Sequence, residues 1–190
     1  VTVKYNNAGT FQWDDTYNSS GSDFDSPVCL AMDGSDNIYM VGYSENGSDE
    51  TDYLIRKYNS AGAIQWTQRY DNANGPDEPR TAVYDPANDR VLITGSTFIT
   101  TAFKLDYWTL SLDASNGAMV WDMNYNGTET DDDIPTGIDV DLAGNTYITG
   151  KSKGIGTNFD YVTIRYDVDG TEHWVDRFQI SGNGLDNPTD

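Results

Sequence analysis

The stretch Gly62-Ala63-Ile64-Gln65-Trp66 places a tryptophan four positions after a glycine, and it decides the fold because this spacing occurs four times in the chain. The four pairs are Gly9 and Trp13, Gly62 and Trp66, Gly117 and Trp121, and Gly170 and Trp174. Successive tryptophans of this series lie 53, 55 and 53 residues apart. A fixed period of this size indicates a repeat architecture in which each repeat is one supersecondary unit.

Two further markers recur with a similar period. Asp-x-Pro triplets begin at Asp25, Asp77, Asp133 and Asp186, and Asp-Tyr pairs begin at Asp52, Asp106 and Asp160. Within each repeat, β-branched and aromatic residues alternate with polar ones, which indicates strands rather than helices. In the best-defined repeat we predict strands over residues 80–85, 91–97, 107–112 and 118–125, with turn residues between them.

A single four-stranded sheet cannot cover both of its own faces, so sheets of this kind must stack on one another. Radial stacking gives the β-propeller, whereas a coil of a linear β-solenoid needs only about 20 to 30 residues. We therefore predict an all-β fold, a β-propeller of about 3.5 four-stranded antiparallel blades that forms an open partial ring. The predicted divisions are a half blade over residues 1–23, blades over 24–73, 74–128 and 129–180, and the start of another blade over 181–190. Both inner strands of the half blade are missing, so we expect the remaining blades to belong to a longer parent chain.

The composition excludes several classes of partner. The 190 residues include 11 lysines and arginines against 31 aspartates and glutamates, which gives a formal net charge of −20. Because every contact with a nucleic-acid phosphate needs a cation, we expect no nucleic-acid partner. No apolar run approaches the roughly 18 residues of a membrane span, so we expect no membrane insertion. The single cysteine, Cys29, has no partner for an internal disulfide.

The fourth repeat carries a recognisable pattern. It reads Asp141-Leu142-Ala143-Gly144-Asn145-Thr146-Tyr147-Ile148-Thr149-Gly150, followed by Asp160-Tyr161, Gly170 and Trp174. This pattern, which returns over residues 33–62, resembles the seven-bladed β-propeller repeat of bacterial secreted and cell-surface proteins. The resemblance implies an extracellular or cell-surface location within a larger protein and no single activity. The segment from Leu112 to Trp121 departs from it and resembles the blade motif of quinone-dependent dehydrogenases.

The Asp-x-Pro aspartates are the main candidates for a binding site. They precede the first strand of each blade, which lines the central channel of a propeller, so Asp25, Asp77, Asp133 and Asp186 are expected to recur around one face. Three interpretations remain open, and one of them is that the aspartates belong to a substrate site. Each aspartate accepts hydrogen bonds from its own turn, or the ring binds calcium, a cation that takes six to eight oxygen ligands. Nearby residues that would add ligands are Asp23, Glu78, Asp131 and Asp132. We expect Asp52, Asp106 and Asp160 to be turn residues at the start of strands.

The aromatic residues divide into two groups. The four periodic tryptophans are expected to be buried between blades, where each indole contributes on the order of 4 to 6 kcal/mol as an upper bound. Trp108 lies outside the series and is the candidate for contact with a ligand at the surface. The only histidine, His173, is expected to point away from the aromatic face, and Cys29 to pack on an inner strand. These two residues offer no support for a Ser-His-Asp, Cys-His or histidine-based metal site.

Together these observations predict a non-enzymatic extracellular scaffold that binds a surface protein or a glycan, with no catalytic residues and no cofactor apart from the calcium interpretation. One alternative is a purely structural spacer, which differs from the scaffold only in lacking a ligand. The other is a fragment of a propeller enzyme that acts on polysaccharides or uses a quinone. The active site of such an enzyme would need blades that this chain does not contain.

Overall fold

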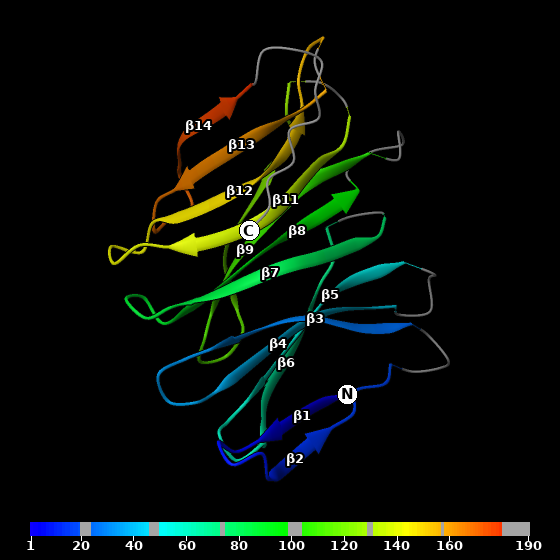
Figure 1. Ribbon diagram of the computed structural model, residues 1–190, viewed down its shortest axis with the longest axis vertical. Coiled ribbons are helices and arrows are strands. Elements are labelled where there is room, and N and C mark those ends of the chain that lie inside the picture. Colours follow the sequence, from blue (N-terminus) through cyan, green and yellow to red (C-terminus); the bar gives the residue numbers. More distant parts are fainter. Residues whose placement is uncertain are drawn as a thin grey trace.

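The computed structural model describes residues 1–19, 24–45, 50–72, 75–98, 104–128, 131–156 and 158–179. Every regular element within these ranges is a β-strand, and the strands form four antiparallel sheets (Figure 1). No helix in the described ranges is long and apolar enough to cross a membrane.

The sheets follow one another along the chain. The half blade contains β1 (Thr2–Tyr5) and β2 (Phe11–Asp15). Blade 1 contains β3 (Asp25–Met32), β4 (Ile38–Glu45), β5 (Thr51–Tyr58) and β6 (Ile64–Tyr70). Blade 2 contains β7 (Asp77–Asp85), β8 (Arg90–Phe98), β9 (Leu105–Asp113) and β10 (Met119–Tyr125). Blade 3 contains β11 (Asp133–Val140), β12 (Thr146–Lys153), β13 (Phe159–Tyr166) and β14 (Glu172–Phe178).

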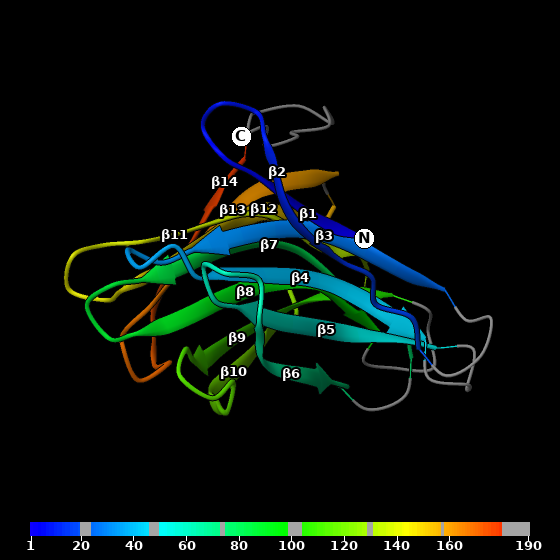
Figure 2. The same cartoon turned by 90° about the horizontal axis from the view of Figure 1, so that it is seen from below.

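Within each sheet the strands pair in chain order, as Figure 2 shows for β3 to β6 of blade 1. The all-β prediction and the predicted four-stranded units are confirmed. The strands predicted in blade 2 are all present, and each observed end lies within three residues of the predicted one. The predicted divisions between blades fall on or beside residues outside the described ranges, which also exclude residues 181–190.

The first strands of the three blades lie side by side, with β3 against β7 and β7 against β11 (Figure 1). The hydrophobic core lies between blades. Tyr39 and Trp66 of blade 1 pack with Ile93 and Leu110 of blade 2 in one cluster. A second cluster joins blade 2 to blade 3, and a third joins the half blade to blade 1. Each blade is therefore stabilised mainly by its neighbours, as the repeat pattern predicts.

The periodic glycines and tryptophans form the joints between these blades. Gly62, Gly117 and Gly170 have φ angles of +88°, +76° and +83° in the turn between the third and fourth strands. A Cβ atom on any of the three would lie 2.6 to 2.8 Å from the indole of the preceding blade, which is that of Trp13, Trp66 or Trp121 in turn. Only glycine allows both this backbone conformation and this close approach. The expected burial between blades is confirmed for Trp66 and Trp121, each 8% exposed. Trp13 is half-buried, and the expectation is wrong for Trp174, which is 40% exposed on the last described blade.

The tyrosine of the Asp-Tyr pair makes a second contact between blades. The Tyr53 hydroxyl lies 3.3 Å from the carbonyl oxygen of Trp108 in blade 2. A Cβ atom on Gly95 of β8 would lie 2.3 Å from that hydroxyl. Tyr107 reaches blade 3 in the same way, because a Cβ atom on Gly150 would lie 2.2 Å from its hydroxyl. The recurring glycine of the second strand therefore makes room for the tyrosine of the blade before it.

Candidate functional site

The candidate site lies where the first strands of the blades begin. Asp25, Asp77 and Asp133 are the first residues of β3, β7 and β11, so the packing of these strands brings their starting ends to one face of the molecule. Asp186, the fourth expected member of the ring, lies outside the described residues.

Each of the three aspartates accepts a hydrogen bond from a described residue shortly before it in the chain. Their Oδ2 atoms accept backbone N–H bonds at 2.9, 2.6 and 2.5 Å from Ser19, Asn72 and Gly127, respectively. Asp77 and Asp133 are fully buried, and Asp25 is half-buried. These hydrogen bonds support the interpretation in which each aspartate accepts hydrogen bonds from its own turn.

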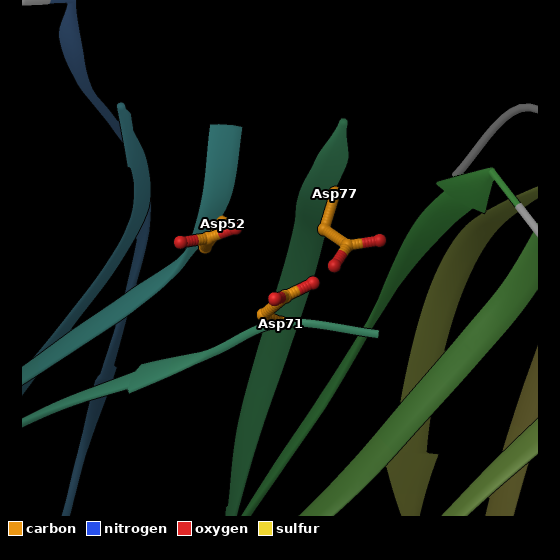
Figure 3. Close-up of side chains that lie close together, drawn as sticks. All are labelled: Asp52, Asp71 and Asp77. Atoms are coloured by element: carbon orange, nitrogen blue, oxygen red, sulfur yellow. The ribbon is translucent and has the colours of Figure 1, made fainter. Parts of the chain in front are cut away.

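Three carboxylates from two blades approach one another closely (Figure 3). Asp52 is the second residue of β5, Asp71 follows β6, and Asp77 begins β7. One carboxylate oxygen of each lies within 4.8 Å of one oxygen of both others. Asp52 also forms an ion pair with Arg69, at 2.9 Å between Oδ2 and Nη1. We refer to Asp52, Asp71 and Asp77 as the acidic trio.

The environment of the acidic trio changes the ionisation of Asp77. Burial raises the pKa of Asp77 from its ordinary 3.8 to about 6, and the charges of Asp71 and Asp52 add to the increase. The hydrogen bond from the Asn72 backbone N–H favours the ionised form and opposes this shift. The trio therefore places the Asp77 carboxyl group of blade 2, whose pKa is raised, beside the carboxylates of Asp52 and Asp71 at the joint with blade 1.

The next joint repeats this arrangement with fewer charges. Asn126 occupies the repeat position of Asp71, and Asn124 occupies that of Arg69. Burial raises the pKa of Asp106 to about 6, with contributions from the charges of Asp133 and Asp132. Burial also raises the pKa of Asp133. This joint keeps two buried carboxyl groups and loses the third, exposed one.

The residues expected to supply extra calcium ligands have other roles or positions. Asp131 forms ion pairs with Lys104, at 2.5 Å, and with Lys153, and these two cations lower the pKa of its carboxyl group. Asp132 accepts a hydrogen bond from the Leu105 backbone N–H. Glu78 is exposed, and Asp23 lies outside the described residues. Within the described ranges, the three acidic side chains close enough to share a cation are the acidic trio, rather than Asp25, Asp77 and Asp133.

The aspartates of the Asp-Tyr pairs correct one expectation. Asp52, Asp106 and Asp160 are not turn residues, because each is the second residue of a third strand and is buried. Two arginines explain how the blades accommodate this. Arg69 and Arg177, on the fourth strands, form ion pairs with Asp52 and Asp160 at 2.9 and 3.2 Å.

Trp108 corrects another expectation. Its side chain is 1% exposed, so the prediction that it contacts a ligand at the surface is wrong. The indole packs against Tyr53 of blade 1, with 4.7 Å between ring centroids, and its Nε1 donates a hydrogen bond to Asp122 at 3.1 Å. The third strand of an internal blade is covered on both faces, so a large side chain there enters the core between blades.

His173 and Cys29 lie as the sequence predicts. His173 is exposed, with its Nε2 3.7 Å from a carboxylate oxygen of Asp167. Cys29 is half-buried on β3 and packs against the core between blades 1 and 2. Burial raises the pKa of the Cys29 thiol to about 11, so it stays neutral near pH 7 and is a poor nucleophile.

The sequence analysis missed Asp71 and the two arginines. Asp71 has no counterpart in the other repeats, so no periodic signal marks it. The arginines do have a signal, because Arg69 and Arg177 each precede the aromatic residue that ends the fourth strand. The equivalent positions in the other two repeats hold Thr16 and Asn124. A search for residues present in every repeat therefore does not find the arginines.

Comparison with known proteins identifies the class of fold. No family model matches the sequence, and no curated protein matches it. Among solved structures, the chain is similar to BamB from Moraxella catarrhalis, with a TM-score of 0.53 and 17% identity. The similarity covers 93% of this chain and 44% of the BamB chain, so this chain spans less than half the length of that protein.

At this level of identity the similarity to BamB shows the fold alone. Together with the four antiparallel sheets, it confirms that the chain is a partial β-propeller of about 3.5 blades. The narrower prediction, a repeat family of secreted bacterial proteins, stays a prediction.

Proposed function

We propose that this chain is a non-catalytic β-propeller segment that acts outside the cell as an interaction scaffold for a protein or a glycan. The observation that carries the proposal is the fixing of successive loops by Asp25, Asp77 and Asp133. Loops carried by a rigid scaffold are the usual place for a binding surface. The extracellular location rests on the sequence resemblance described above.

The same hydrogen bonds argue against a catalytic role for these aspartates. A general acid or base must come within hydrogen-bonding distance of its substrate. Asp77 and Asp133 are 0% exposed, and each holds a backbone N–H of its own loop. Their carboxyl groups therefore serve the conformation of the loops, and a ligand would meet the exposed residues beside them.

The charge of the chain narrows the chemistry of the partner. With a net charge of −20, the chain repels anionic surfaces, and a neutral or basic partner surface meets less repulsion. Exposed acidic residues at the candidate site, Asp71 and Glu78, would contact such a partner directly.

A binding screen with matched variants tests this proposal. The full chain is screened against a panel of glycans and cell-surface proteins, and each ligand found is titrated against Asp71→Lys, Glu78→Lys and Asp169→Lys. Asp169 is an exposed residue in the turn between β13 and β14, at the opposite end of the blades. Affinity lost in the first two variants and kept in the third supports the proposal. Equal affinity in all three variants, or no ligand in the panel, contradicts it.

One observation favours the alternative, a fragment of an enzyme. Asp71, the exposed member of the acidic trio, lies within 4.8 Å of the buried carboxyl groups of Asp52 and Asp77. Neighbouring carboxyl groups in unlike environments are an arrangement that general acid–base catalysis uses. Turnover of a polysaccharide or a quinone-linked substrate by the complete parent propeller, lost in Asp71→Asn, would support the enzyme and contradict the scaffold.

The calcium prediction made from the sequence now applies to the acidic trio. Three carboxylate oxygens within 4.8 Å of one another match the spacing of oxygens around one calcium ion. The ion pair between Asp52 and Arg69 competes with such binding. A rise in the unfolding temperature on adding Ca²⁺ to the natural chain, absent in Asp71→Asn, would support a calcium site.

A further inference from the structure

Asparagine followed by glycine recurs in the chain, and two such pairs lie wholly within the described ranges, Asn116-Gly117 and Asn126-Gly127. In a pair of this kind the backbone nitrogen of the glycine can attack the side-chain amide carbon of the asparagine, because glycine has no Cβ to hinder the approach. Both asparagines are exposed, so exposure does not distinguish them. Their hydrogen bonds do.

The first pair is held inside a blade joint. The Asn116 Oδ1 accepts the Ala118 backbone N–H at 2.7 Å, and the Gly117 N–H donates to the carbonyl oxygen of Asp113 at 2.8 Å. Gly117 is buried, with a φ angle of +76° and the indole of Trp66 against it. Attack by the Gly117 nitrogen therefore requires this turn and its contact with the preceding blade to open.

The second pair lies just beyond the end of β10 and is held differently. Among the residues that the structure describes, none forms a hydrogen bond with the Asn126 side chain, and Gly127 is half-buried. The Gly127 N–H donates to Oδ2 of Asp133 at 2.5 Å. This acceptor is a carboxyl group, which can take up the proton that the attacking nitrogen must lose, whereas a backbone carbonyl oxygen cannot. Asp133 is thus placed as a general base toward Gly127.

We propose that Asn126 is a site of spontaneous chemical modification, at which the folded chain converts the asparagine to aspartate or isoaspartate. The Gly127 nitrogen bonds to Cγ of Asn126 while its proton passes to Asp133. The side-chain amino group takes that proton from Asp133 and leaves as ammonia, which closes a succinimide ring. One water molecule then opens the ring at either carbonyl group. The reacting groups belong to the chain itself, so the burial of Asp133 does not keep it from this role.

The product has a precedent in the neighbouring joint. Asn126 occupies the repeat position of Asp71, and in both blades the backbone N–H of the next residue donates to the Asp-x-Pro aspartate. The Asp71 carboxylate lies within 4.8 Å of the other two members of the acidic trio, so the fold accommodates a carboxylate at this position. Conversion to aspartate would therefore give the next joint the same three acidic positions, with Asp106 and Asp133 as the other two.

Peptide mapping by mass spectrometry, on the full folded chain incubated at mildly alkaline pH, is the direct test. Conversion adds about 1 Da to the peptide that contains Asn126 and introduces a negative charge. We expect it to proceed about tenfold faster at Asn126 than at Asn116, because only the second asparagine needs a blade joint to open. No conversion at Asn126, or conversion no faster than at Asn116, overturns the proposal.

The same chain in guanidinium chloride is the first control. Both asparagines precede glycine, so without the fold they should convert at similar rates. A preference for Asn126 that persists unchanged in the denatured chain would show that the preference does not come from the structure. Conversion at Asn126 that is slower in the folded chain than in the denatured chain would contradict assistance by Asp133.

Variants separate the site from its assisting carboxyl group. Asn126→Gln should abolish the gain of negative charge seen by ion-exchange chromatography, because glutamine would have to close a six-membered ring. Asn116→Gln is its matched control and should convert at Asn126 like the natural chain.

Asp133→Asn keeps an oxygen that accepts the Gly127 N–H but cannot take up its proton, so conversion at Asn126 should slow severalfold. Asp77→Asn makes the equivalent change in the preceding blade and should leave the rate at Asn126 unchanged. An unchanged or faster rate in Asp133→Asn overturns the transfer of the proton to Asp133. Far-UV circular dichroism identifies any variant that does not fold, and in that case the comparison of folded with denatured natural chain decides.

Discussion

At the scale of single residues, the glycine and tryptophan that recur four positions apart are not partners of each other. Gly117 receives Trp66, and Gly170 receives Trp121, so each glycine serves the blade before its own. In each repeat the glycine contacts the blade before and the tryptophan contacts the blade after. The separation of four residues therefore recurs although the two residues do not contact each other. The sequence analysis predicted the burial of Trp66 and Trp121 from their periodicity, whereas the partner of each became visible only when blades lay next to one another.

The joint at Gly117 gives the first prediction. A Cβ atom there would lie 2.7 Å from Gln68 Cγ and 2.8 Å from Trp66 Cε3, and the φ angle of +76° disfavours any other residue. Gly117→Ala should lower the free energy of unfolding by about 3 kcal/mol. Urea denaturation measures this change. Gly34→Ala, at a glycine with nothing within 4 Å, is the control, and equal losses in the two variants would contradict the joint.

Trp66 gives the second prediction. Its indole is 8% exposed and its Nε1 donates to Ala114. Trp66→Ala should cost about 3 to 5 kcal/mol of stability. His173→Ala, at an exposed position, should change stability by no more than about 0.5 kcal/mol. Thermal unfolding of both variants decides, and comparable shifts would argue against the assignment of strand faces.

The third prediction concerns pH. Because burial raises the pKa of Asp77 from 3.8 to about 6, the folded chain binds more protons than the unfolded chain between these values. The stability associated with protonated Asp77 is therefore present below about pH 4 and is lost as the pH rises through about 6. Asp77→Asn should reduce the fall in stability over this range by on the order of 2 kcal/mol.

Urea denaturation at several pH values between about 4 and 7 measures this difference. Asp169→Asn, at an exposed position, is the control and should follow the natural chain. A pH dependence that is the same for Asp77→Asn and the natural chain would show that Asp77 titrates normally in the folded protein.

At the scale of elements, strand positions were predictable because alternation with a period of two records which face of a strand is buried. The ends of strands were less predictable. Asp52 and Asp160 look like turn residues in the sequence, since aspartate is usually found in turns, but ion pairs with arginines on the fourth strand keep them inside the sheet. Trp108 was misplaced because the sequence does not show that its strand is covered on both faces.

The ion pair of blade 1 gives the fourth prediction. Arg69 bonds to Asp52 and to the backbone and side chain of Ser44, so it links the second, third and fourth strands. Arg69→Met leaves the Asp52 carboxylate buried without its cation and should cost about 3 kcal/mol of stability. Adding Asp52→Asn should recover part of that loss. A double mutant no more stable than Arg69→Met would contradict this.

At the scale of the whole molecule, the fold follows from the repeats, and the site follows from their differences. The Asp-x-Pro aspartates recur, so the sequence predicted that they lie at the same end of the blades and that they accept hydrogen bonds in turns. The acidic trio depends on contact between two blades and on Asp71, whose equivalent positions in the other repeats hold no aspartate. A feature of that kind has no periodic signal, so it becomes visible only in the assembled structure.

The net charge gives the fifth prediction. Mutual repulsion among the 31 acidic residues disfavours the compact state, and salt screens it. Raising NaCl from about 0.05 to about 0.5 M should raise the unfolding temperature by a few degrees. An unchanged or lower unfolding temperature would contradict the prediction.

The joint between Trp66 and Gly117 has a consequence for how such a chain changes over generations. At each of the three joints a fourth-strand tryptophan contacts the turn glycine of the next blade, and only the residues around that pair differ from joint to joint. Duplication or deletion of one entire repeat therefore leaves each tryptophan facing a turn glycine at the new boundary. Unequal recombination between repeats can therefore lengthen or shorten the gene by one blade at a time and keep the contact between tryptophan and glycine at every joint.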